Sequence, residues 1–312
     1  MLDPSALHGI VPPVVTPLTP DGDIDDRSLT SACRFLLASG VHGIWAAGTT
    51  GEFACFTADE REGIVQTCVE AAGGRVPVVA NAGDCSTRLA LDHARRALGA
   101  GVDALALTPP YYYLNSQEEL KAHFRAVRSA VDLPLLVYNI PQTVKAEMDV
   151  GTVLSLAEEG TVVGMKDSQN DLDWDRTLVA GLRERNVPFR LFVGTRSLID
   201  AGILLGGCGA IPGPSNAAPA WCVATYEAAA EGDYAEARRR QERLLTVGPL
   251  LGLASGGSAQ ANAIGSIKLA LKVMGVIEHA TLAAPLRSPS AEDEQRVAEF
   301  VQAIGLPVPV AA

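Results

Sequence analysis

The sequence predicts an α/β fold, a closed (β/α)₈ TIM barrel followed by a C-terminal extension of three helices. Short apolar, β-rich runs recur about every 25 to 30 residues from residue 9 to about residue 231, with longer amphipathic stretches between them. The length of 312 residues fits one barrel of roughly 250 residues plus an extension. An open doubly wound sheet would show the same alternation, but no strand is followed by GxGxxG or by a Walker phosphate-binding pattern.

The strand candidates come in order along the chain, and each is followed by a helical pattern. Helices over 57–72 and 116–130 each begin with a capping box, in which Glu follows a Ser or Thr by three residues. Eight parallel strands with helices between them close into a barrel. The candidates are 9–15, 42–47, 76–81, 103–108, 134–138, 161–166, 189–193 and 208–211.

The chain after residue 231 contains helical patterns and no strand pattern. The helices are predicted over 233–248, 260–274 and 291–303. We therefore expect residues 1–231 to form the barrel and residues 232–312 to form a helical extension packed on it.

Composition excludes several classes of function. The formal net charge of −11 disfavours binding to nucleic acid or to anionic membranes. The N-terminus has no signal-peptide pattern, and no apolar run reaches the roughly 18 residues of a membrane-spanning helix. The six cysteines and five histidines show no metal-ligand spacing, and the cysteines are expected to be reduced core residues. These features predict a cytoplasmic protein with no metal or other cofactor, whose ligand is a small molecule.

Lys166 is the strongest candidate for a reactive side chain. Active sites of barrels lie at the C-terminal ends of the strands, and Lys166 ends the strand candidate 161–166. Side-chain alternation places it on the same face as Gly164, which we expect to leave room for the lysine stem. Burial disfavours the ammonium form, and a neutral amine can attack a carbonyl carbon to form a Schiff base. The alternative is a lysine paired with the carboxylate of Asp167.

Two more strand ends carry residues suited to chemistry. The second strand runs into Gly48-Thr49-Thr50-Gly51, a tight turn whose N–H groups and hydroxyls can converge on a carboxylate. The fifth strand ends at Tyr138, one strand before the lysine, where a phenol can relay protons. The structural alternatives are an ordinary turn of small residues and a ring that caps the barrel.

Two further strand ends indicate a partner and a pocket wall. Strand four runs into Tyr111, Tyr112 and Tyr113, and one barrel mouth cannot bury all three rings. We therefore expect one of them to pack on a partner subunit. Strand eight runs into Ile211 among glycines and a proline, where backbone carbonyls can face a ligand, although a plain turn would look the same.

Taken together, these motifs resemble the dihydrodipicolinate synthase/N-acetylneuraminate lyase family of class I, Schiff-base-forming aldolases. PPVVTPL, GTTGE, TPPYYYLNSQEEL, LVYNIP and VGMKDS occur in the family's order and spacing over nearly the whole chain. The resemblance implies that Lys166 forms an imine with a 2-oxo acid, typically pyruvate, and that Tyr138 is the acid/base group. It also implies that Thr49 links Tyr138 to Tyr112, whose ring reaches in from a neighbouring subunit.

The resemblance also implies how the substrate is held. Thr50, with the adjacent N–H groups of the turn from Gly48 to Gly51, would bind the 2-oxo acid carboxylate, and the Ile211 carbonyl would line the pocket. The family's usual form is a homotetramer built from tight dimers, which we expect here.

Two positions depart from the family's synthases. There an arginine five residues after the strand-five tyrosine grips the carboxylate of the aldehyde partner, whereas Thr143 stands here, with Lys145 nearby as a point charge. Phe53 replaces a small residue in a region that some synthases use for lysine feedback, so such regulation is not expected.

Three functional hypotheses remain open. The departures favour a lyase that cleaves or dehydrates a 2-keto-3-deoxy sugar acid. The second hypothesis is a 4-hydroxy-tetrahydrodipicolinate synthase that condenses pyruvate with aspartate semialdehyde. The third is a non-catalytic barrel that binds a small 2-oxo acid.

Overall fold

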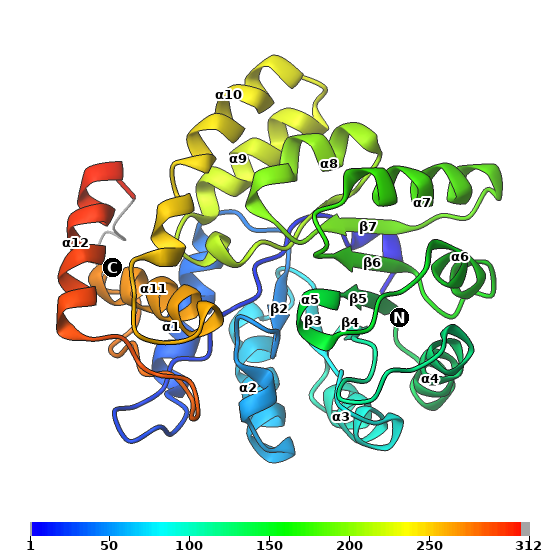
Figure 1. Cartoon of the computed structure of the whole chain (residues 1–312), viewed down its shortest axis with the longest axis horizontal. Helices are drawn as coiled ribbons and strands as arrows, with labels where there is room; N and C mark the ends of the chain where they lie inside the picture. The colour runs from blue at the N-terminus through cyan, green and yellow to red at the C-terminus, as the bar shows by residue number, and fades with distance from the viewer. Residues whose placement is uncertain (1, 307–312) are drawn as a thin grey trace.

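The computed structural model describes residues 2–306 and contains eight parallel strands surrounded by helices (Figure 1). In the sheet, neighbouring strands follow the order β1-β8-β7-β6-β5-β4-β3-β2. Hydrogen bonds from His42 N to Ile10 O (2.8 Å) and from Trp45 N to Pro12 O (2.9 Å) join the two edges and close the barrel. The predicted fold class is confirmed. The strands are β1 (Gly9–Ile10), β2 (Ile44–Ala46), β3 (Val78–Asn81), β4 (Ala104–Leu107), β5 (Leu135–Asn139), β6 (Gly164–Asp167), β7 (Arg190–Val193) and β8 (Gly209–Ala210).

The first strand is shorter than its predicted range of 9–15. Pro12 and Pro13 have no backbone N–H and cannot donate to the ladder, so regular pairing stops at Ile10. The segment nevertheless stays beside β2, since Val14 N donates to Trp45 O at 3.0 Å. The other seven strands overlap their predicted ranges.

β1 and β8 meet at two glycines that permit an unusually close approach. Gly9 has a φ of +75°, a conformation that favours glycine. A Cβ atom on Gly209 would lie only 2.1 Å from the carbonyl oxygen of Gly9. A side chain at residue 209 would therefore separate the first strand from the last.

The helices after the strands form the outer layer of the barrel. Both predicted capping boxes are present, at Thr57 and Ser116. One apolar cluster, including Trp45, Leu136 and Phe192, fills the barrel interior, and a larger one lies between strands and helices. The helices are α1 (Asp26–Ala38), α2 (Ala58–Ala72), α3 (Thr87–Gly99), α4 (Gln117–Ala130), α5 (Pro141–Val144), α6 (Val150–Glu158), α7 (Leu172–Glu184), α8 (Ile199–Leu205) and α9 (Pro219–Ala230).

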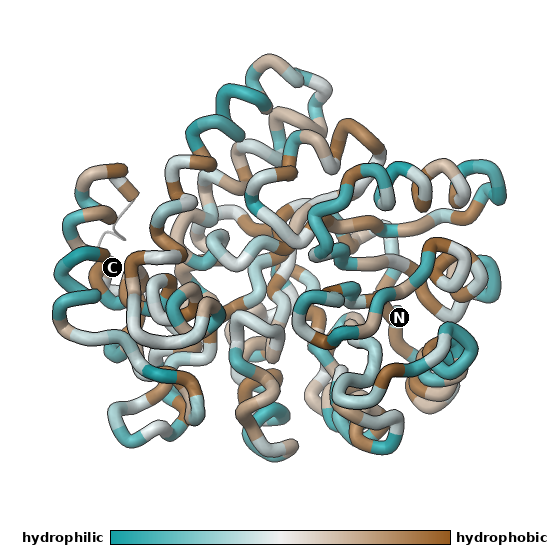
Figure 2. Tube along the Cα trace, in the orientation of Figure 1, coloured by the Kyte–Doolittle hydropathy of each residue, from teal (hydrophilic) through white to brown (hydrophobic). Residues whose placement is uncertain are grey.

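Three more helices follow at the predicted places, α10 (Tyr234–Leu245), α11 (Ala259–Val273) and α12 (Ala291–Ile304). α10 packs against α8 and α9, and α11 packs against α12. Hydrophilic residues run along most of α10 at the edge of the molecule (Figure 2). The last part of the predicted extension, residues 307–312, lies outside the described residues. No helix within residues 2–306 has the length and apolar character needed to cross a membrane.

Asp175, on α7, makes the stability of the fold depend on pH. The residue is 1% exposed, and its Oδ1 has no hydrogen-bond partner among residues 2–306. Burial, reinforced by the carboxylates of Asp167 and Asp171, raises the pKa of Asp175 from 3.8 to about 7. The stability associated with the protonated carboxyl is therefore complete below about pH 4 and is lost as the pH rises through 7.

We expect Asp175→Asn to stabilise the protein at neutral and alkaline pH. The variant should exceed the wild type in free energy of unfolding by on the order of 2 kcal/mol at pH 8, because the amide never ionises. The difference should shrink as the pH falls from 7 and vanish near pH 4, as measured by urea unfolding. Asp173→Asn, at an exposed position of the same helix, is the control and should show no such difference. A pH-independent difference would contradict this account.

Candidate active site

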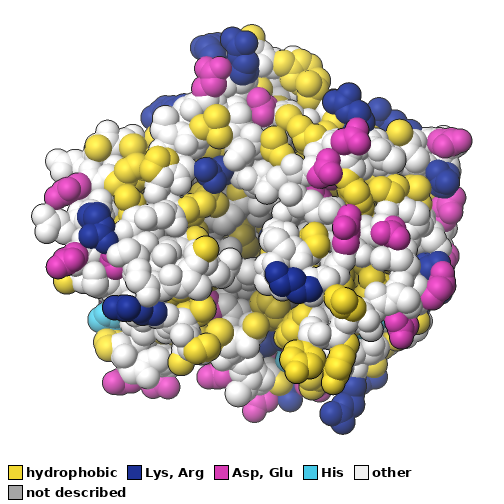
Figure 3. Space-filling model, in the orientation of Figure 1, with side chains coloured by type: hydrophobic (Ala, Val, Ile, Leu, Met, Phe, Trp, Pro, Cys, Tyr) yellow, Lys and Arg dark blue, Asp and Glu magenta, His cyan; other side chains and the backbone are white. Residues whose placement is uncertain are grey.

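A cavity of about 310 Å³ opens at the C-terminal ends of the barrel strands. Its walls come from the segments that end or follow β2, β5, β6, β7 and β8 and from helix α11. The face seen in Figure 3 is hollowed near its middle, and most of the acidic side chains in this view lie away from the hollow. We call this cavity the polar lobe. Its lining includes Thr50, Tyr138, Lys166, Ser168, Arg196 and Ile211.

Lys166 lies inside the barrel and is 4% exposed. Parallel pairing places it beside Tyr138 of β5 and Phe192 of β7. Its Nζ lies 4.1 Å from the centroid of the Tyr138 ring and 5.1 Å from that of Trp45. The amine therefore sits between two aromatic rings at the floor of the polar lobe.

Lys166 is not paired with Asp167, so that alternative is wrong. The Asp167 carboxylate instead accepts hydrogen bonds from Asn139 Nδ2 (2.8 Å) and Gln169 N (3.0 Å). Among the described residues, the lysines that form ion pairs are Lys121, Lys268 and Lys272. The amine of Lys166 is thus left without a carboxylate partner.

The expected role of Gly164 needs correction. A Cβ atom on this residue would lie 2.5 Å from Arg190 O and 2.8 Å from Arg190 Cβ. The space left by the missing side chain is therefore occupied by strand β7 and not by the stem of Lys166. Glycine is needed here because the β6 and β7 backbones approach closely.

Tyr138 and Thr49 are in contact, as the resemblance implies. Tyr138 Oη and Thr49 Oγ1 are 3.0 Å apart, and either hydroxyl can donate. The Tyr138 ring, 2% exposed, meets the edge of Trp45 at a centroid distance of 5.4 Å and an angle of 76°. This packing fixes the ring, so the phenol oxygen is held toward the threonine.

The turn from Gly48 to Gly51 combines close packing with free donors. A Cβ on Gly48 would lie 2.9 Å from the Trp45 ring, and one on Gly51 would lie 2.9 Å from Val14 O. Both glycines are thus required by packing. Within residues 2–306, the N–H groups of Thr50 and Gly51 donate no hydrogen bond to the protein. They remain available to an anion beside the Thr50 hydroxyl.

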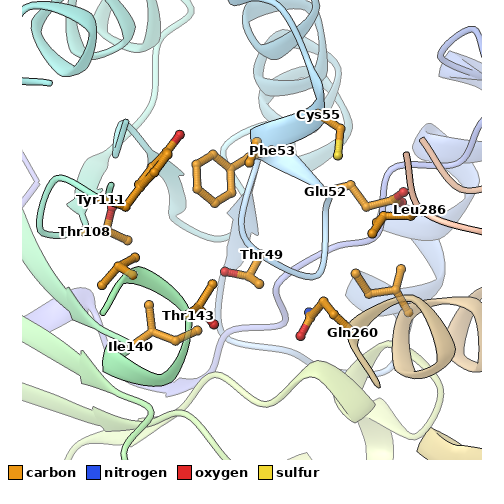
Figure 4. Close-up of a pocket in the computed structure, with 13 residues that line it drawn as sticks. Thr49, Glu52, Phe53, Cys55, Thr108, Tyr111, Ile140, Thr143, Gln260 and Leu286 are labelled. Carbon is orange, nitrogen blue, oxygen red and sulfur yellow. The ribbon is translucent and has the colours of Figure 1, made fainter. Parts of the chain in front are cut away.

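A second cavity of about 220 Å³ adjoins the polar lobe. Figure 4 shows the residues that line this second cavity. Both are lined by Thr49, Ile140 and Thr143. We call it the apolar lobe, since among the described residues no Lys, Arg or His lines it. The lining includes Phe53, Cys55, Tyr111, Val144, Ile264 and Leu286.

Thr143 therefore stands where the two lobes meet, and among the described residues no cation lines the apolar lobe on its other side. Lys145 does not take the place of the missing arginine. Its Nζ donates to Gln142 O at 2.9 Å, and the residue lines neither lobe.

The tyrosine loop is divided between the cavity and the surface. Tyr111 lines the apolar lobe, and burial together with the Asp84 carboxylate raises the pKa of its phenol to about 12. Tyr112 is 87% exposed with a φ of +88°, and Tyr113 is 74% exposed. Gly48, Gly51 and Tyr112 line neither lobe of their own chain. The predicted site residues that do line the cavity are Thr49, Thr50, Tyr138, Thr143, Lys166 and Ile211.

Several residues around the site were not predicted from the sequence. Trp45 could have been found, because it alternates onto the inner face of the strand that leads to the turn. Lys268 and Glu52 form a buried ion pair, with Nζ and Oε1 2.5 Å apart and both side chains 0% exposed. Lys268 lies within an apolar helix pattern, but nothing local indicates its partner 216 residues earlier. Arg196 at the polar lobe also carried no local signal.

Comparison with known proteins identifies the family. The family model described as the dihydrodipicolinate synthetase family matches residues 6–304. An uncharacterized DapA-like lyase of Halobacterium salinarum is 35% identical over 298 residues, which cover 95% of this chain and 93% of that protein. A 4-hydroxy-tetrahydrodipicolinate synthase of Thioalkalivibrio sulfidiphilus is 38% identical over 270 residues, covering 86% of this chain and 88% of the relative.

Solved structures agree with this assignment. YagE, a prophage protein of the dihydrodipicolinic acid synthase family from E. coli K12 solved in complex with pyruvate, superimposes with a TM-score of 0.90 at 26% identity. That match covers 96% of this chain and 99% of YagE. The dihydrodipicolinate synthase of Aquifex aeolicus matches with a TM-score of 0.87 at 30% identity, covering 96% of this chain and 99% of its own. The chain therefore belongs to the dihydrodipicolinate synthetase family and is a lyase of that family.

Proposed function

We propose that this lyase acts on pyruvate or a 2-keto-3-deoxy sugar acid through an imine formed at Lys166. The observation that carries the proposal is the buried amine without a carboxylate partner at the floor of a cavity, beside the Tyr138–Thr49 hydroxyl pair. A binding protein for 2-oxo acids needs a carboxylate site, but it does not need this amine and hydroxyl set. The arrangement therefore favours catalysis over the non-catalytic hypothesis.

The chemistry follows from the properties of an imine. The Lys166 amine attacks C2 of the 2-oxo acid, and the carbinolamine loses water to give the imine. In cleavage, a base removes the C4 hydroxyl proton, the C3–C4 bond breaks, and its electron pair moves toward the protonated imine nitrogen. An aldehyde leaves and an enamine remains. Protonation at C3 and hydrolysis then release pyruvate and restore the amine.

The surrounding groups have separate roles in this proposal. Tyr138 moves protons at the carbinolamine and imine, with Thr49 holding its hydroxyl. The Thr50 hydroxyl and the free N–H groups of the turn bind the 2-oxo acid carboxylate, with Ile211 lining the pocket. The carboxylate is bonded directly to the reacting carbonyl carbon, so holding it at the turn keeps C2 close to the Lys166 amine.

The cavity favours a sugar acid over aspartate semialdehyde. Thr143 stands where the synthases carry an arginine, and among the described residues no cation lines the apolar lobe, so neither can grip the carboxylate of a small aldehyde acid as that arginine does. The polar lobe instead offers hydrogen-bonding side chains from three strand ends, Gln142, Ser168 and Thr195. Such groups suit the hydroxyls of a 2-keto-3-deoxy sugar acid. The alternative remains 4-hydroxy-tetrahydrodipicolinate synthase activity, as in several relatives.

The wild-type protein provides the direct test of the imine. Incubation with pyruvate and borohydride should give a covalent adduct visible by intact mass, and omission of either reagent should give none. Activity is then measured on 2-keto-3-deoxygluconate and related sugar acids, alongside pyruvate with aspartate semialdehyde. Turnover of the sugar acids supports the first hypothesis, and condensation of the second pair supports the synthase. Absence of the pyruvate adduct would contradict an imine mechanism.

Tyr138→Phe should lower kcat by about 10² to 10⁴ because it removes the proton-relay hydroxyl. The melting temperature should change little, because the ring keeps its packing against Trp45. Steady-state kinetics and the rate of imine trapping are the measurements. Tyr113→Phe, on the exposed side of the tyrosine loop, is the control and should keep full activity. An unchanged kcat for the Tyr138 variant would remove this residue from the mechanism.

We further propose that the protein is a cytoplasmic homotetramer, a dimer of dimers, in which Tyr112 reaches the neighbouring site. Tyr112 and Tyr113 form a nearly perpendicular exposed ring pair with centroids 5.1 Å apart, a surface suited to a partner. The six cysteines are unpaired, as is usual in a reducing compartment. Analytical ultracentrifugation tests the assembly, and a fully active monomer would exclude a role for Tyr112 across subunits.

A further inference from the structure

Arg196 supplies the second cationic side chain of the polar lobe. It follows β7 and begins a short 3₁₀ turn, Arg196–Leu198. Among the described residues that line the polar lobe, only Lys166 and Arg196 are cationic. The imine mechanism uses Lys166 and assigns nothing to Arg196.

The guanidinium of Arg196 has no partner in the part of the chain that the structure describes. Within residues 2–306 it forms no ion pair and donates no hydrogen bond, and its Nε is buried without an acceptor. Burial lowers the pKa of Arg196 from its ordinary value, and the nearby Cys222 thiol, whose pKa burial raises to about 12, stays neutral. A half-buried cation that lacks a counter-charge is costly unless a ligand provides one.

Hydrogen bonds and close packing hold Arg196 in place. The buried side chain of Gln241 donates from Nε2 to Arg196 O at 2.7 Å and accepts from Ile199 N at 3.1 Å. Gly248 lies beside the guanidinium, where a Cβ atom would be only 2.5 Å from Nη2. The backbone is thus clamped, and the glycine leaves the space that the charged group occupies.

We infer that Arg196 binds an anionic group, a carboxylate or a phosphate ester, at the end of the substrate remote from its 2-oxo acid carboxylate. The inference rests on the proposed function and narrows it to 2-oxo acids that carry a second anion, such as sugar diacids or phosphorylated sugar acids. Thr50 and the turn hold the first carboxylate near Lys166, so Arg196 is left for the far end. A planar guanidinium binds carboxylate and phosphate in bidentate fashion, which gives discrimination against a neutral end.

The test compares two six-carbon 2-oxo acids that differ only at the far end. 2-Oxoadipate ends in a carboxylate and 2-oxohexanoate in a methyl group. Borohydride traps each on the protein, and the concentration for half-maximal adduct is read by intact mass. For the wild type, the half-maximal concentration of 2-oxoadipate should be at least about tenfold lower than that of 2-oxohexanoate. Arg196→Met should abolish the preference, and Arg196→Lys should keep part of it.

Pyruvate separates this inference from the proposed function. It has no second anionic group, so its half-maximal concentration should agree within about twofold in all three proteins. If the wild type fails to trap pyruvate, the imine mechanism itself is wrong. Two results would overturn the role of Arg196 while pyruvate is trapped normally. In the first, the wild type needs as much 2-oxoadipate as 2-oxohexanoate for half-maximal adduct. In the second, Arg196→Met keeps the wild-type preference for 2-oxoadipate. Arg196→Lys keeps the test valid should the methionine variant fail to fold.

A second arm identifies the anion. 2-Keto-3-deoxygluconate, its 6-phosphate and 2-keto-3-deoxyglucarate differ only at C6, and each is used as a competitor of pyruvate trapping. Stronger competition by the diacid assigns a carboxylate, and stronger competition by the phosphate ester assigns a phosphate. Equal competition by all three would count against an anion site at Arg196.

Discussion

Lys166→Ala is expected to abolish turnover, with a loss of at least about a thousandfold, because no other amine lines the polar lobe among the described residues. The imine cannot form without a primary amine, so every later step is lost with it. Trapping with pyruvate and borohydride should give no adduct on the variant. The effect should appear in kcat and not only in KM, since the lost group acts in the bond-making steps.

The fold should survive this change, which makes the result interpretable. Lys166 forms no ion pair in the described structure, and its contacts are with the rings of Tyr138 and Trp45. Lys166→Arg is the matched control, because it keeps the charge but cannot form an imine, and it should be equally inactive. Both variants should keep a cooperative thermal transition. An adduct that persists in Lys166→Ala would mean that another residue is the nucleophile.

Lys268→Met should have the largest effect on stability, about 3 to 5 kcal/mol, because it leaves the Glu52 carboxylate buried without its partner. Glu52 has a left-handed backbone with a φ of +59° and directly follows the Thr49–Gly51 turn. Its Oε2 accepts from Ala283 N at 2.7 Å, and Lys268 Nζ donates to Thr281 O at 2.7 Å. The pair therefore ties the turn of the site to the C-terminal extension.

The same change should also weaken substrate binding, since the turn that we propose to hold the carboxylate loses its support. Urea unfolding measures the stability, and KM for a 2-oxo acid reports how well the turn binds the substrate carboxylate. The Lys272–Glu294 pair offers a control on the same helix, with a 2.6 Å contact and side chains 34% and 37% exposed. Lys272→Met should cost less than about 1 kcal/mol. If both lysine variants lose a similarly small free energy of unfolding, burial does not make the Lys268–Glu52 pair more important for stability than the exposed pair.

A double variant separates charge from packing at this position. Glu52→Gln combined with Lys268→Met removes both charges and should recover part of the loss seen with Lys268→Met alone. If the losses of free energy of unfolding in Glu52→Gln and in Lys268→Met simply add in the double variant, the two residues are not coupled.

The sequence alone predicted the elements and the lysine that we propose as the nucleophile. Strand alternation placed Lys166 on the inner face at a strand end, and capping boxes predicted the starts of α2 and α4, because these signals lie within a few neighbouring residues. Prolines shortened β1 below its predicted range, although the sequence shows them plainly. Our prediction of a strand over 9–15 followed the apolar pattern and gave too little weight to the N–H donors that the prolines lack.

Only the tertiary structure decided what surrounds that lysine. The role of Gly164, the Lys268–Glu52 pair and the division of the cavity into two lobes depend on strands or helices far apart in the sequence. Periodicity reports which face of an element is buried, but it does not report which residue of another element lies opposite. Closure of the barrel and docking of α11 set those partners, and through them the unpaired Arg196 that we assign to the far end of the substrate.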